Sequence, residues 1–552
     1  MEPVPRYLVN FSLRDLPCLQ TDVLIIGSGI AGLFTALKLT PRRVIVTAKD
    51  RPEDCCTYLA QGGIAAAMDE EDSADLHTAD TLAAGAGLGD PEAARVLAEE
   101  GPERIRELLE WGIAFDREEG RLALAREGAH SRRRVLHAGG DATGAVLWRG
   151  LFAKARATEG LQILSHTMVL DLLVEEGRCF GALVLLPDGS TAAVLAAATV
   201  LAGGGAGALY PVTTNPAGAT GDGVAMAYRA GAEVADLEFY QFHPTALAHP
   251  GAAGLLITEA VRGEGAVLRN ARGERFMPGY HPRAELAPRD VVARAIVSEM
   301  ARTGEGRVYL DLKHLDPGWL ECRFPTLVDT CRRAGLDPAR HWLPVAPAAH
   351  YFMGGVRTDL KGRTILEGLY ACGEVACTGA HGANRLGSNS LLEGLVFGGR
   401  VARELLNRPL KAPPCPPLEY RELGGEGPEE AAGDAVARLR EIMGARVGLV
   451  REAGGLEEAA CRIEEMWPLL YRGAAGRMGA EARNMLLLAA LMVKAAAWRC
   501  ESRGAHYRAD FPAPDPAYAK HLVLARGREP REVPVRGFAR EIKFPGGGGK
   551  YA

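Results

Sequence analysis

Hydrophobic and polar positions near the N-terminus follow the pattern of a strand, a helix and a second strand. Residues 22–26 form a short apolar run that ends in glycine, and residues 33–39 form an apolar stretch that predicts a helix. A second β-branched run, 43–47, follows after a short connection. This order of elements is typical of the start of a parallel sheet. We therefore expect an α/β fold.

Two later apolar runs predict further strands of the same sheet. Residues 198–202 lead into three glycines, and residues 368–371 lead into Cys372-Gly373-Glu374. Because strands so far apart share this glycine ending, we predict one sheet interrupted by an inserted domain. The expected parts are a sheet domain (1–235 and 346–408), an inserted α+β capping domain (236–345), a proline-rich linker (409–428), and a C-terminal helical domain with a tail (429–552).

The last of these parts has three stretches of helical pattern, at 429–444, 456–471 and 479–502. The third is the most regular, with apolar residues repeating at helical spacing from Leu486 to Val493. Three short helices of this kind predict a small bundle at the C-terminal end of the chain.

Composition and charge exclude several classes of protein. The chain has 552 residues, 47% of them apolar and 24% charged, and a formal net charge of −5. This balance offers no broad basic surface for nucleic acid or an anionic membrane. The sequence shows no signal peptide and no membrane-spanning stretch. Its eleven cysteines include no CxxC pair, which argues against a metal site and favours reduced thiols in the cytoplasm.

The segment Gly27-Ser28-Gly29-Ile30-Ala31-Gly32 has GxGxxG spacing after a predicted strand and before a predicted helix. Glycines permit a tight turn there, and the helix N-terminus then faces a pyrophosphate. The alternative is a glycine-rich turn without a ligand. Sites for NAD usually carry an acidic residue after the second strand, where this chain has Thr47-Ala48-Lys49. That departure weakens NAD without establishing FAD.

Eight further segments, in chain order, resemble the flavoproteins of succinate dehydrogenase and fumarate reductase. They are YLAQGGIA (58–65), TGDG (220–223), QFHPT (241–245), TEAVRG (258–263), PRD (288–290), HYFMGG (350–355), NRLGSNS (384–390) and ESRGAH (501–506). The match covers nearly the whole chain. It implies a Rossmann-like FAD-binding domain, an inserted capping domain and a C-terminal helical domain.

The resemblance also implies the residues that bind FAD. They are Gly27, Ser28, Gly29, Ile30, Ala31, Gly32, Lys49, Cys56, Thr57, Ala60, Gln61, Gly62, Gly63, Asp222, Glu374, Ser390 and Leu391. Members with covalent FAD carry histidine at the position of Cys56, so we expect a non-covalent cofactor. Residues 388–390 also provide N-cap chemistry for a helix whose positive end would face the flavin; a plain helix cap is the alternative.

In this family a dicarboxylate is bound by residues that match His243, Thr258, Arg289, His350 and Arg385 in this chain. Arginine binds carboxylate through two parallel donors, and histidine and threonine add directional ones. The family assigns proton transfer to an arginine matching Arg289, relayed through Glu259 and Arg262. Because arginine stays protonated in proteins, an electrostatic clamp is the alternative. Taken alone, His243 would be a turn residue and Arg289 a solvated surface partner of Asp290.

Residues 125–131 (AREGAHS) resemble a segment of the L-aspartate oxidases, a branch of this family whose glutamate orients the substrate amino group. Glu127 matches that glutamate; an ordinary loop acid is the alternative reading. The basic run 131–137 is too short to indicate nucleic-acid binding, and it favours a phosphate contact, a loop anchor or solvated surface.

We therefore predict an FAD-dependent oxidoreductase that converts L-aspartate to iminoaspartate, with oxygen or fumarate as electron acceptor. In the family this is the first step of NAD synthesis through quinolinate, which suggests a functional link to quinolinate synthase in the cytoplasm. The expected ligands are L-aspartate, fumarate and succinate, with no metal and no nucleic acid. The alternatives are a soluble fumarate reductase or succinate dehydrogenase flavoprotein subunit, and a flavin carrier without substrate chemistry.

Overall fold

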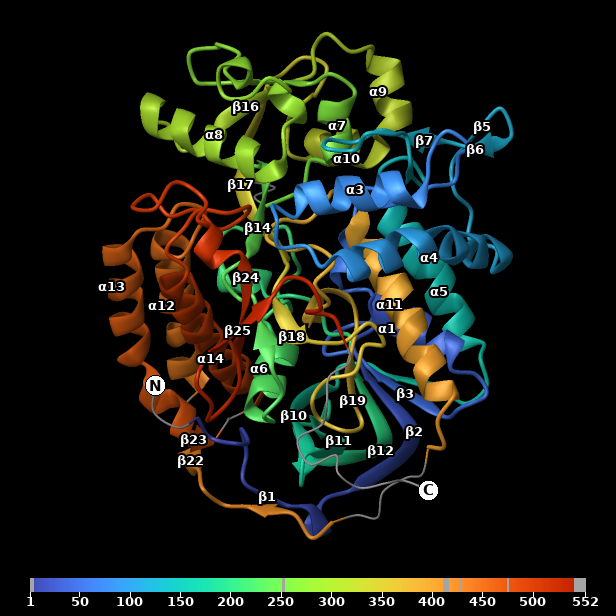
Figure 1. The fold of residues 1–552 in the computed structure, drawn as a ribbon, viewed down its shortest axis with the longest axis vertical. Coiled ribbons are helices and arrows are strands. Elements are labelled where there is room, and N and C mark those ends of the chain that lie inside the picture. The colour runs from blue at the N-terminus through green and yellow to red at the C-terminus, as the bar shows by residue number, and fades with distance from the viewer. Residues whose placement is uncertain (1–3, 251–253, 411–415, 427–428, 474–475, 541–552) are drawn as a thin grey trace.

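The computed structural model describes residues 4–250, 254–410, 416–426, 429–473 and 476–540. The central sheet occupies the lower right of Figure 1, the C-terminal helices lie on the left, and the capping domain lies at the top. The predicted fold class is confirmed: an α/β sheet domain with an inserted α+β domain and a helical bundle.

The strand-helix-strand unit expected near the N-terminus is present. It comprises β2 (Cys18–Ile26), α1 (Ile30–Lys38) and β3 (Val44–Thr47), and β2 pairs in parallel with β3. The sheet has the order β10-β11-β12-β2-β3-β9, with β19 beside β12. Its other strands are β9 (Leu161–Leu164), β10 (Met168–Glu175), β11 (Arg178–Leu185), β12 (Thr191–Leu201) and β19 (Leu369–Ala371).

The two strands predicted to belong to one sheet do pair. The second half of β12 runs parallel to β19, with Thr199 opposite Leu369, while its first half pairs with β11 of an antiparallel hairpin. β12 also runs parallel to β2 along most of its length. Residues 170 positions apart thus meet beside the glycine turn that follows β2.

Both faces of the sheet are buried, as expected for parallel strands. Alternate residues of β2 point to opposite faces, so Val23 and Ile25 join one core and Leu24 and Ile26 another. α1 and α11 (Asn389–Leu406) pack against each other in the first core. α6 (Asp222–Arg229) and the C-terminal bundle contribute to the second.

The capping domain is an antiparallel sheet of order β14-β17-β16-β15 with helices around it. Its strands are β14 (Tyr240–Leu247), β15 (Val267–Arg269), β16 (Val308–Asp311) and β17 (Leu343–Phe352), and its helices α7 (Glu259–Gly263), α8 (Arg289–Thr303), α9 (Pro317–Arg323) and α10 (Pro325–Arg333). The expected boundary between 345 and 346 lies inside β17. This strand and β14 connect the capping domain to the sheet domain.

The C-terminal bundle consists of α12 (Glu429–Arg446), α13 (Ala453–Glu464) and α14 (Gly476–Trp498). The helix expected over 456–471 ends at Glu464 and is followed by a 3-10 turn over Trp467–Tyr471, where Pro468 has no N–H to continue an α-helix. No helix in the described part of the chain has the length and apolar character of a membrane span.

After the bundle the chain returns to the body of the protein, which the sequence pattern does not predict. β24 (Lys520–Leu524) and β25 (Arg531–Pro534) complete a sheet of order β20-β18-β13-β24-β25 with β13 (Val234–Ala235), β18 (Gly355–Arg357) and β20 (Ala376–Cys377). The expected tail beyond residue 540 lies outside the described residues. Within the expected linker, β21 (Glu419–Tyr420) pairs with β1 (Phe11–Ser12), and β22 (Gly424–Glu426) pairs with β23 (Arg472–Gly473).

The remaining elements lie between β3 and β9 and frame one side of the site. They are α2 (Cys56–Leu59), β4 (Ile64–Ala65), α3 (Ala74–Ala84), α4 (Pro91–Glu110), β5 (Arg117–Glu118), β6 (Arg121–Leu122), β7 (Leu124–Ala125), β8 (Val135–Leu136) and α5 (Thr143–Arg156). β8 pairs with both β4 and β7, and this small sheet carries the loop that holds Glu127.

Candidate active site

A cavity opens at the carboxyl ends of β2, β3 and β12, where open α/β sheets usually bind ligands. It is bordered by the N-terminal ends of α1 and α11 and reaches β17 at His350 and Tyr351. The cavity therefore runs from the glycine turn to the base of the capping domain. The predicted cofactor residues that line it are Gly27, Ser28, Gly29, Ile30, Ala31, Lys49, Cys56, Thr57, Ala60, Asp222, Glu374, Ser390 and Leu391.

Two glycines of the turn are required for different physical reasons. Gly27 has a φ of +120°, and a Cβ there would lie 2.2 Å from the carbonyl oxygen of Ala202. Gly32 lies inside α1, where a Cβ would lie 2.0 Å from the carbonyl oxygen of Gly27. Gly32 therefore allows α1 to pack closely against the turn and does not itself line the cavity.

Three other predicted cofactor residues lie outside the cavity wall. Gly63 packs against β8, because a Cβ there would be 2.3 Å from the side chain of Val135. A Cβ on Gly62 would be 4.0 Å from Glu127 Oε1, so this glycine lies beside a residue predicted to bind the substrate. Gln61 is buried, and its Oε1 has no hydrogen-bond partner among the described residues. A buried acceptor of this kind is suited to an N–H group of a ligand.

The cavity has the donors that a flavin dinucleotide needs. α1 and α11 both begin at its wall, and N–H groups in the first turn of a helix have no partner within the helix, so they can bind an anion or a carbonyl oxygen. The first of these in α1, Ile30 N–H, donates to Thr57 Oγ1. Burial raises the pKa of Glu374 to about 7. At neutral pH this carboxyl can therefore carry a proton and donate a hydrogen bond to a ligand. Gln61 lies outside the cavity wall and has the free acceptor described above. These features fit FAD.

Lys49 is neutralised by carboxylates within the protein. Its ammonium group donates to Asp222 Oδ2 at 2.6 Å and Thr220 Oγ1 at 2.7 Å, and it pairs with Glu481 Oε1 at 2.9 Å. Glu481 comes from α14 and was not expected from the sequence. The lysine thus joins the cavity wall to the C-terminal bundle.

Cys56 lines the cavity at the start of α2. Burial raises the pKa of this thiol well above its usual value, so the sulfur is held as a neutral thiol. The nucleophilic form of cysteine is the thiolate, and the site therefore disfavours attachment of a cofactor through Cys56.

Two histidines lie where the cavity meets the capping domain. His243 in β14 and His350 in β17 have ring centroids 5.1 Å apart, and His350 Nδ1 lies 2.8 Å from Thr214 Oγ1. Burial, together with the positive charge of Arg289 and Arg385, holds the pKa of both histidines well below the usual range. Both are neutral, which leaves each with one donor and one acceptor.

Two arginines meet at one glutamine beside these histidines. Arg289 Nη1 donates to Gln241 Oε1 at 3.2 Å, and Arg385 Nη2 donates to the same oxygen at 3.1 Å. Arg385 also lies over the ring of Tyr351 at 4.3 Å, and burial lowers its pKa to about 10. Sequence reasoning did not select Gln241, although it lies in the segment 241–245 that carries the family resemblance.

Arg289 is not a solvated surface residue. It is 9% exposed, and its Nε donates to Glu259 Oε2 at 2.6 Å, whereas Asp290 pairs with Arg294. The surface reading of Arg289 is therefore wrong. Since Glu259 holds Nε and Gln241 holds Nη1, the Nη2 group is the one best placed to bind a ligand.

The short helix α7 brings the other family residues together. Thr258 is its N-cap and accepts a hydrogen bond from Ala260 N at 3.4 Å. Glu259 and Arg262 are three residues apart and lie on one face of this helix, with Arg262 Nη2 at 3.7 Å from Glu259 Oε2. Glu259 thus lies between two guanidinium groups, those of Arg262 and Arg289.

Glu127 lies on the opposite side of this cluster, in the loop between β7 and β8. Its Oε2 accepts a hydrogen bond from Ser388 Oγ at 2.7 Å, and its Oε1 lies 3.6 Å from His137 Nε2. Burial disfavours the charge, but His137 and Ser388 outweigh it and lower the pKa of Glu127 to about 2. The carboxylate is ionised and buried, so the reading as an ordinary loop acid is wrong.

Gly387 lies between Glu127 and the arginine cluster. A Cβ on Gly387 would lie 3.2 Å from Glu127 Oε2, 3.4 Å from Arg289 Nη2 and 3.7 Å from Glu259 Oε2. The carboxylate of Glu127 and the guanidinium of Arg289 therefore border the same small space. The structure brings Glu127 together with the residues predicted to bind the dicarboxylate.

Ser388 does not cap α11 with its side chain. It occupies the N-cap position with a φ of +61°, but its hydroxyl makes no capping hydrogen bond and donates to Glu127 instead. The expectation of side-chain capping by Ser388 is wrong, because the buried carboxylate competes for the same hydroxyl. The Ser388 side chain therefore caps none of the N–H groups at this helix end, whose first N–H, that of Asn389, donates to the carbonyl oxygen of Leu386.

The three arginines of the basic run 131–137 differ in burial. Arg132 and Arg133 are exposed, whereas Arg134 is fully buried and pairs with Asp72 and Asp80. Of the readings open from the sequence, the loop anchor fits Arg134 and solvated surface fits its two neighbours. Within the described residues, no group of His, Cys, Asp and Glu is arranged to hold a metal ion.

Comparisons with known proteins agree with this architecture. Residues 22–391 match the family model of an FAD binding domain, and residues 477–541 match that of the fumarate reductase flavoprotein C-terminus. The FrdA chain of an E. coli quinol fumarate reductase superposes with a TM-score of 0.85 at 29% identity, covering 94% of this chain and 97% of that one. The cofactor predicted from the sequence, FAD, is thus confirmed.

Similar proteins of higher identity come from one branch of that family. The L-aspartate oxidase of Streptomyces coelicolor is 48% identical over 532 residues, which are 92% of this chain and 91% of that protein. The L-aspartate oxidase of Nostoc sp. is 42% identical over 561 residues, with coverage of 95% and 96%. The chain belongs to the L-aspartate oxidase family, within the succinate dehydrogenase and fumarate reductase flavoproteins.

Proposed function

We propose that the chain oxidises L-aspartate to iminoaspartate, with non-covalent FAD as its cofactor and oxygen or fumarate as the final electron acceptor. The relatives at 42–48% identity carry the name of this activity. The observation that carries the proposal is the ionised carboxylate of Glu127, buried beside the arginine cluster.

The cofactor would lie in the cavity between the N-terminal ends of α1 and α11. Ser28, Gly29 and Ala31 would meet the pyrophosphate at the first helix, and Ser390 and Leu391 would meet the flavin at the second. FAD, when bound, supplies an acceptor for the electron pair that leaves the substrate. Cys56, a neutral thiol at the position where covalent members carry histidine, supports the non-covalent form.

Arg289 and Arg385 would bind the two carboxylates of the substrate. Gln241 holds one edge of each guanidinium, so neither has to be ordered when the substrate arrives. The neutral His243 and His350 would add hydrogen bonds without adding charge. Together these groups would fix the central carbon–carbon bond of a dicarboxylate in one orientation.

Glu127 would bind the ammonium group that distinguishes aspartate from succinate. An ammonium group beside two arginines is unfavourable unless a carboxylate lies close to it. The space next to Gly387 borders both Glu127 Oε2 and Arg289 Nη2, which suits a ligand that carries both charges. A simple dicarboxylate has no group to place against Glu127.

Arg289, Glu259 and Arg262 also form the row that the wider family uses for proton transfer. Glu259 Oε2 is 2.6 Å from Arg289 and 3.7 Å from Arg262. In fumarate reduction this row would deliver a proton to the substrate carbon. In fumarate reduction and in L-aspartate oxidation alike, Arg289 would also stabilise a carboxylate of the substrate. Burial lowers the pKa of Arg262.

The test is the Glu127→Gln variant, which keeps shape and removes charge. We expect kcat/KM for L-aspartate to fall by about 100-fold, because the ammonium loses its partner, while fumarate reduction stays within about threefold. Glu118→Gln, an exposed glutamate on a nearby hairpin, is the matched control. An equal loss of both activities would remove Glu127 from substrate discrimination.

The similarity in fold to fumarate reductase favours a second candidate, a fumarate-reducing flavoprotein without amino-acid oxidation. It predicts that Glu127→Gln changes neither activity selectively. A flavin carrier without substrate chemistry is less well supported, since it has no need of Arg289 and Arg385. The cytoplasmic location and the link to quinolinate synthase remain predictions.

A further inference from the structure

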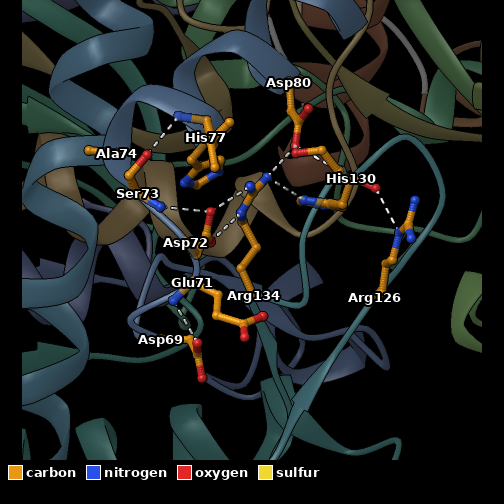
Figure 2. A network of polar contacts seen from close by, with 12 residues as sticks. Asp69, Glu71, Asp72, Ser73, Ala74, His77, Asp80, Arg126, His130 and Arg134 are labelled. Atoms are coloured by element: carbon orange, nitrogen blue, oxygen red, sulfur yellow. Dashed lines mark hydrogen bonds and ion pairs between the residues drawn. The ribbon is translucent and has the colours of Figure 1, made fainter.

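A buried arginine lies behind the substrate cluster, in a network that the proposed reaction does not use. Arg134 stands directly before β8, and its side chain is fully buried. Its Nε and Nη2 donate to the two oxygens of Asp72 at 2.8 Å each, and its Nη1 donates to Asp80 in α3. Figure 2 shows the guanidinium enclosed by these carboxylates. Paired in this way, it has a fixed orientation.

The same guanidinium determines which ring nitrogen of His130 carries the proton. Arg134 Nη1 lies 3.2 Å from His130 Nδ1. A dashed line marks this contact in Figure 2. Because arginine has donors only, Nδ1 must accept this hydrogen bond. The imidazole is buried and neutral, so its proton is on Nε2. His130 Nε2 therefore donates to the carbonyl oxygen of Gly387, at 3.0 Å.

Gly387 and Ser388 connect this hydrogen bond to Glu127. The carbonyl held by His130 belongs to the peptide that leads into Ser388, whose hydroxyl donates to Glu127 Oε2 at 2.7 Å. From the other side, the backbone N–H of His130 donates to the carbonyl oxygen of Glu127 at 3.3 Å. One histidine thus holds both the loop that presents Glu127 and the peptide beside the arginine cluster.

We propose that His130, held by Arg134 with its proton on Nε2, is a positioning residue that fixes Glu127 for the substrate ammonium group and so sets the preference for an amino acid over an unsubstituted dicarboxylate. This inference rests on the function proposed above for Glu127. His130 itself does not touch the substrate; it acts through Gly387 and Ser388. Arg134 acts one step further away, through the tautomer of His130.

A positioning role and a merely structural role of His130 predict different results when His130 is replaced. Loss of folding would affect flavin retention and both activities together. Loss of positioning affects only the ligand group that meets Glu127, because Arg289 and Arg385 are held independently by Gln241. The ratio of the KM values for L-aspartate and fumarate is therefore the informative quantity.

The experiment compares two variants of the holoenzyme. His130→Leu keeps volume and loses the donor, and we expect the KM for L-aspartate to rise by about tenfold, with the KM for fumarate within about twofold. His130→Gln keeps a nitrogen donor near the place of Nε2, and it should restore most of the wild-type ratio. The matched control is Arg133→Leu, an exposed residue on the same loop that should leave both values unchanged.

The Glu127→Gln variant distinguishes a failure of the role proposed for His130 from a failure of the function proposed for Glu127. If it discriminates between the substrates and His130→Leu does not, the positioning role is wrong and the proposed function stands. If it shows no discrimination, the function proposed for Glu127 fails and the inference fails with it. In the double variant, His130→Leu should have no further effect on the KM ratio, because its target is already lost.

A spectroscopic measurement tests the inference without any loss of folding. In the wild-type holoenzyme labelled with ¹⁵N-histidine, the resonances of His130, assigned by their absence in His130→Gln, should show a protonated Nε2 and an unprotonated Nδ1. In Arg134→Leu the tautomer should no longer be fixed. A proton on Nδ1 in the wild type would overturn the proposal.

Discussion

The two ends of the active site are built in different ways. At the glycine turn, the cavity is shaped by backbone, with Gly27 and Gly32 needed because no side chain fits. At the capping domain, the site consists of side chains from six separate segments, among them β14, α7 and the start of α8. The glycine motif at the first end lies in one stretch of sequence, whereas the side chains at the second come together only after folding. Substitutions should therefore act on geometry at one end and on chemistry at the other.

The largest effect is expected at the backbone end, from Gly27→Ala. The new Cβ would lie 2.2 Å from the carbonyl oxygen of Ala202, at a φ that L residues rarely adopt. We expect purified protein without FAD and without activity, measured as the ratio of flavin to protein.

Gly189→Ala is the control for that variant. Gly189 also has a positive φ, but nothing lies within 4 Å of its Cβ position. It should retain flavin at the cost of about 1 kcal/mol of strain. Full flavin content in Gly27→Ala would show that the close backbone packing at Gly27 is not required for FAD binding.

An intermediate effect is expected at the side-chain end, from Arg289→Lys. Lysine keeps the charge but cannot donate to Glu259 and Gln241 while also binding a carboxylate. We expect kcat/KM to fall by about 100-fold for L-aspartate oxidation and for fumarate reduction alike, with flavin content unchanged. A selective loss of one reaction would show that Arg289 serves one substrate only.

The smallest effect is a pH dependence of stability that comes from the buried histidines. Burial holds the pKa of His243 well below its ordinary value of 6.5, so the unfolded chain binds the proton that the folded chain excludes. This contribution is complete above pH 6.5 and is lost as the pH falls below it, by up to about 1.4 kcal/mol per pH unit.

The measurement is the free energy of unfolding of the wild type and of His243→Gln between pH 7 and pH 5. The variant should lose less stability over this range, although it is less stable at pH 7. His314→Gln, at an exposed position, should follow the wild type. A parallel decline in all three proteins would contradict the neutral state of His243 in the fold.

The same contrast explains what the sequence could predict. The strand-turn-helix unit was readable because its signals are local: an apolar run, glycines at fixed spacing and a helical repeat. The pairing of β12 with β19 was readable because both runs end in glycine beside the cofactor cavity. In contrast, β24 and β25 are not predicted, because β24 pairs with β13, which lies nearly 300 residues earlier and gives no local sign, and β25 is held in the sheet through β24.

Contacts between distant side chains were the least predictable part of the site. Gln241 and Ser388 lie in segments that carry the family resemblance, yet their targets are known only once Arg289, Arg385 and Glu127 are placed in space. A serine before a helix is usually a cap, and only a buried carboxylate 261 residues away redirects its hydroxyl. The sequence pattern around Ser388 does not show that its hydroxyl bonds to Glu127 and does not cap the helix.

The most direct test of the account is anaerobic spectroscopy of the purified holoenzyme. L-aspartate and succinate would be added to separate samples. The absorption of the oxidised flavin at about 450 nm would then be followed. The account predicts that L-aspartate bleaches this band and succinate does not, and that Glu127→Gln abolishes the response to L-aspartate. Bleaching by succinate alone would contradict it and would identify the chain as a dehydrogenase of unsubstituted dicarboxylates.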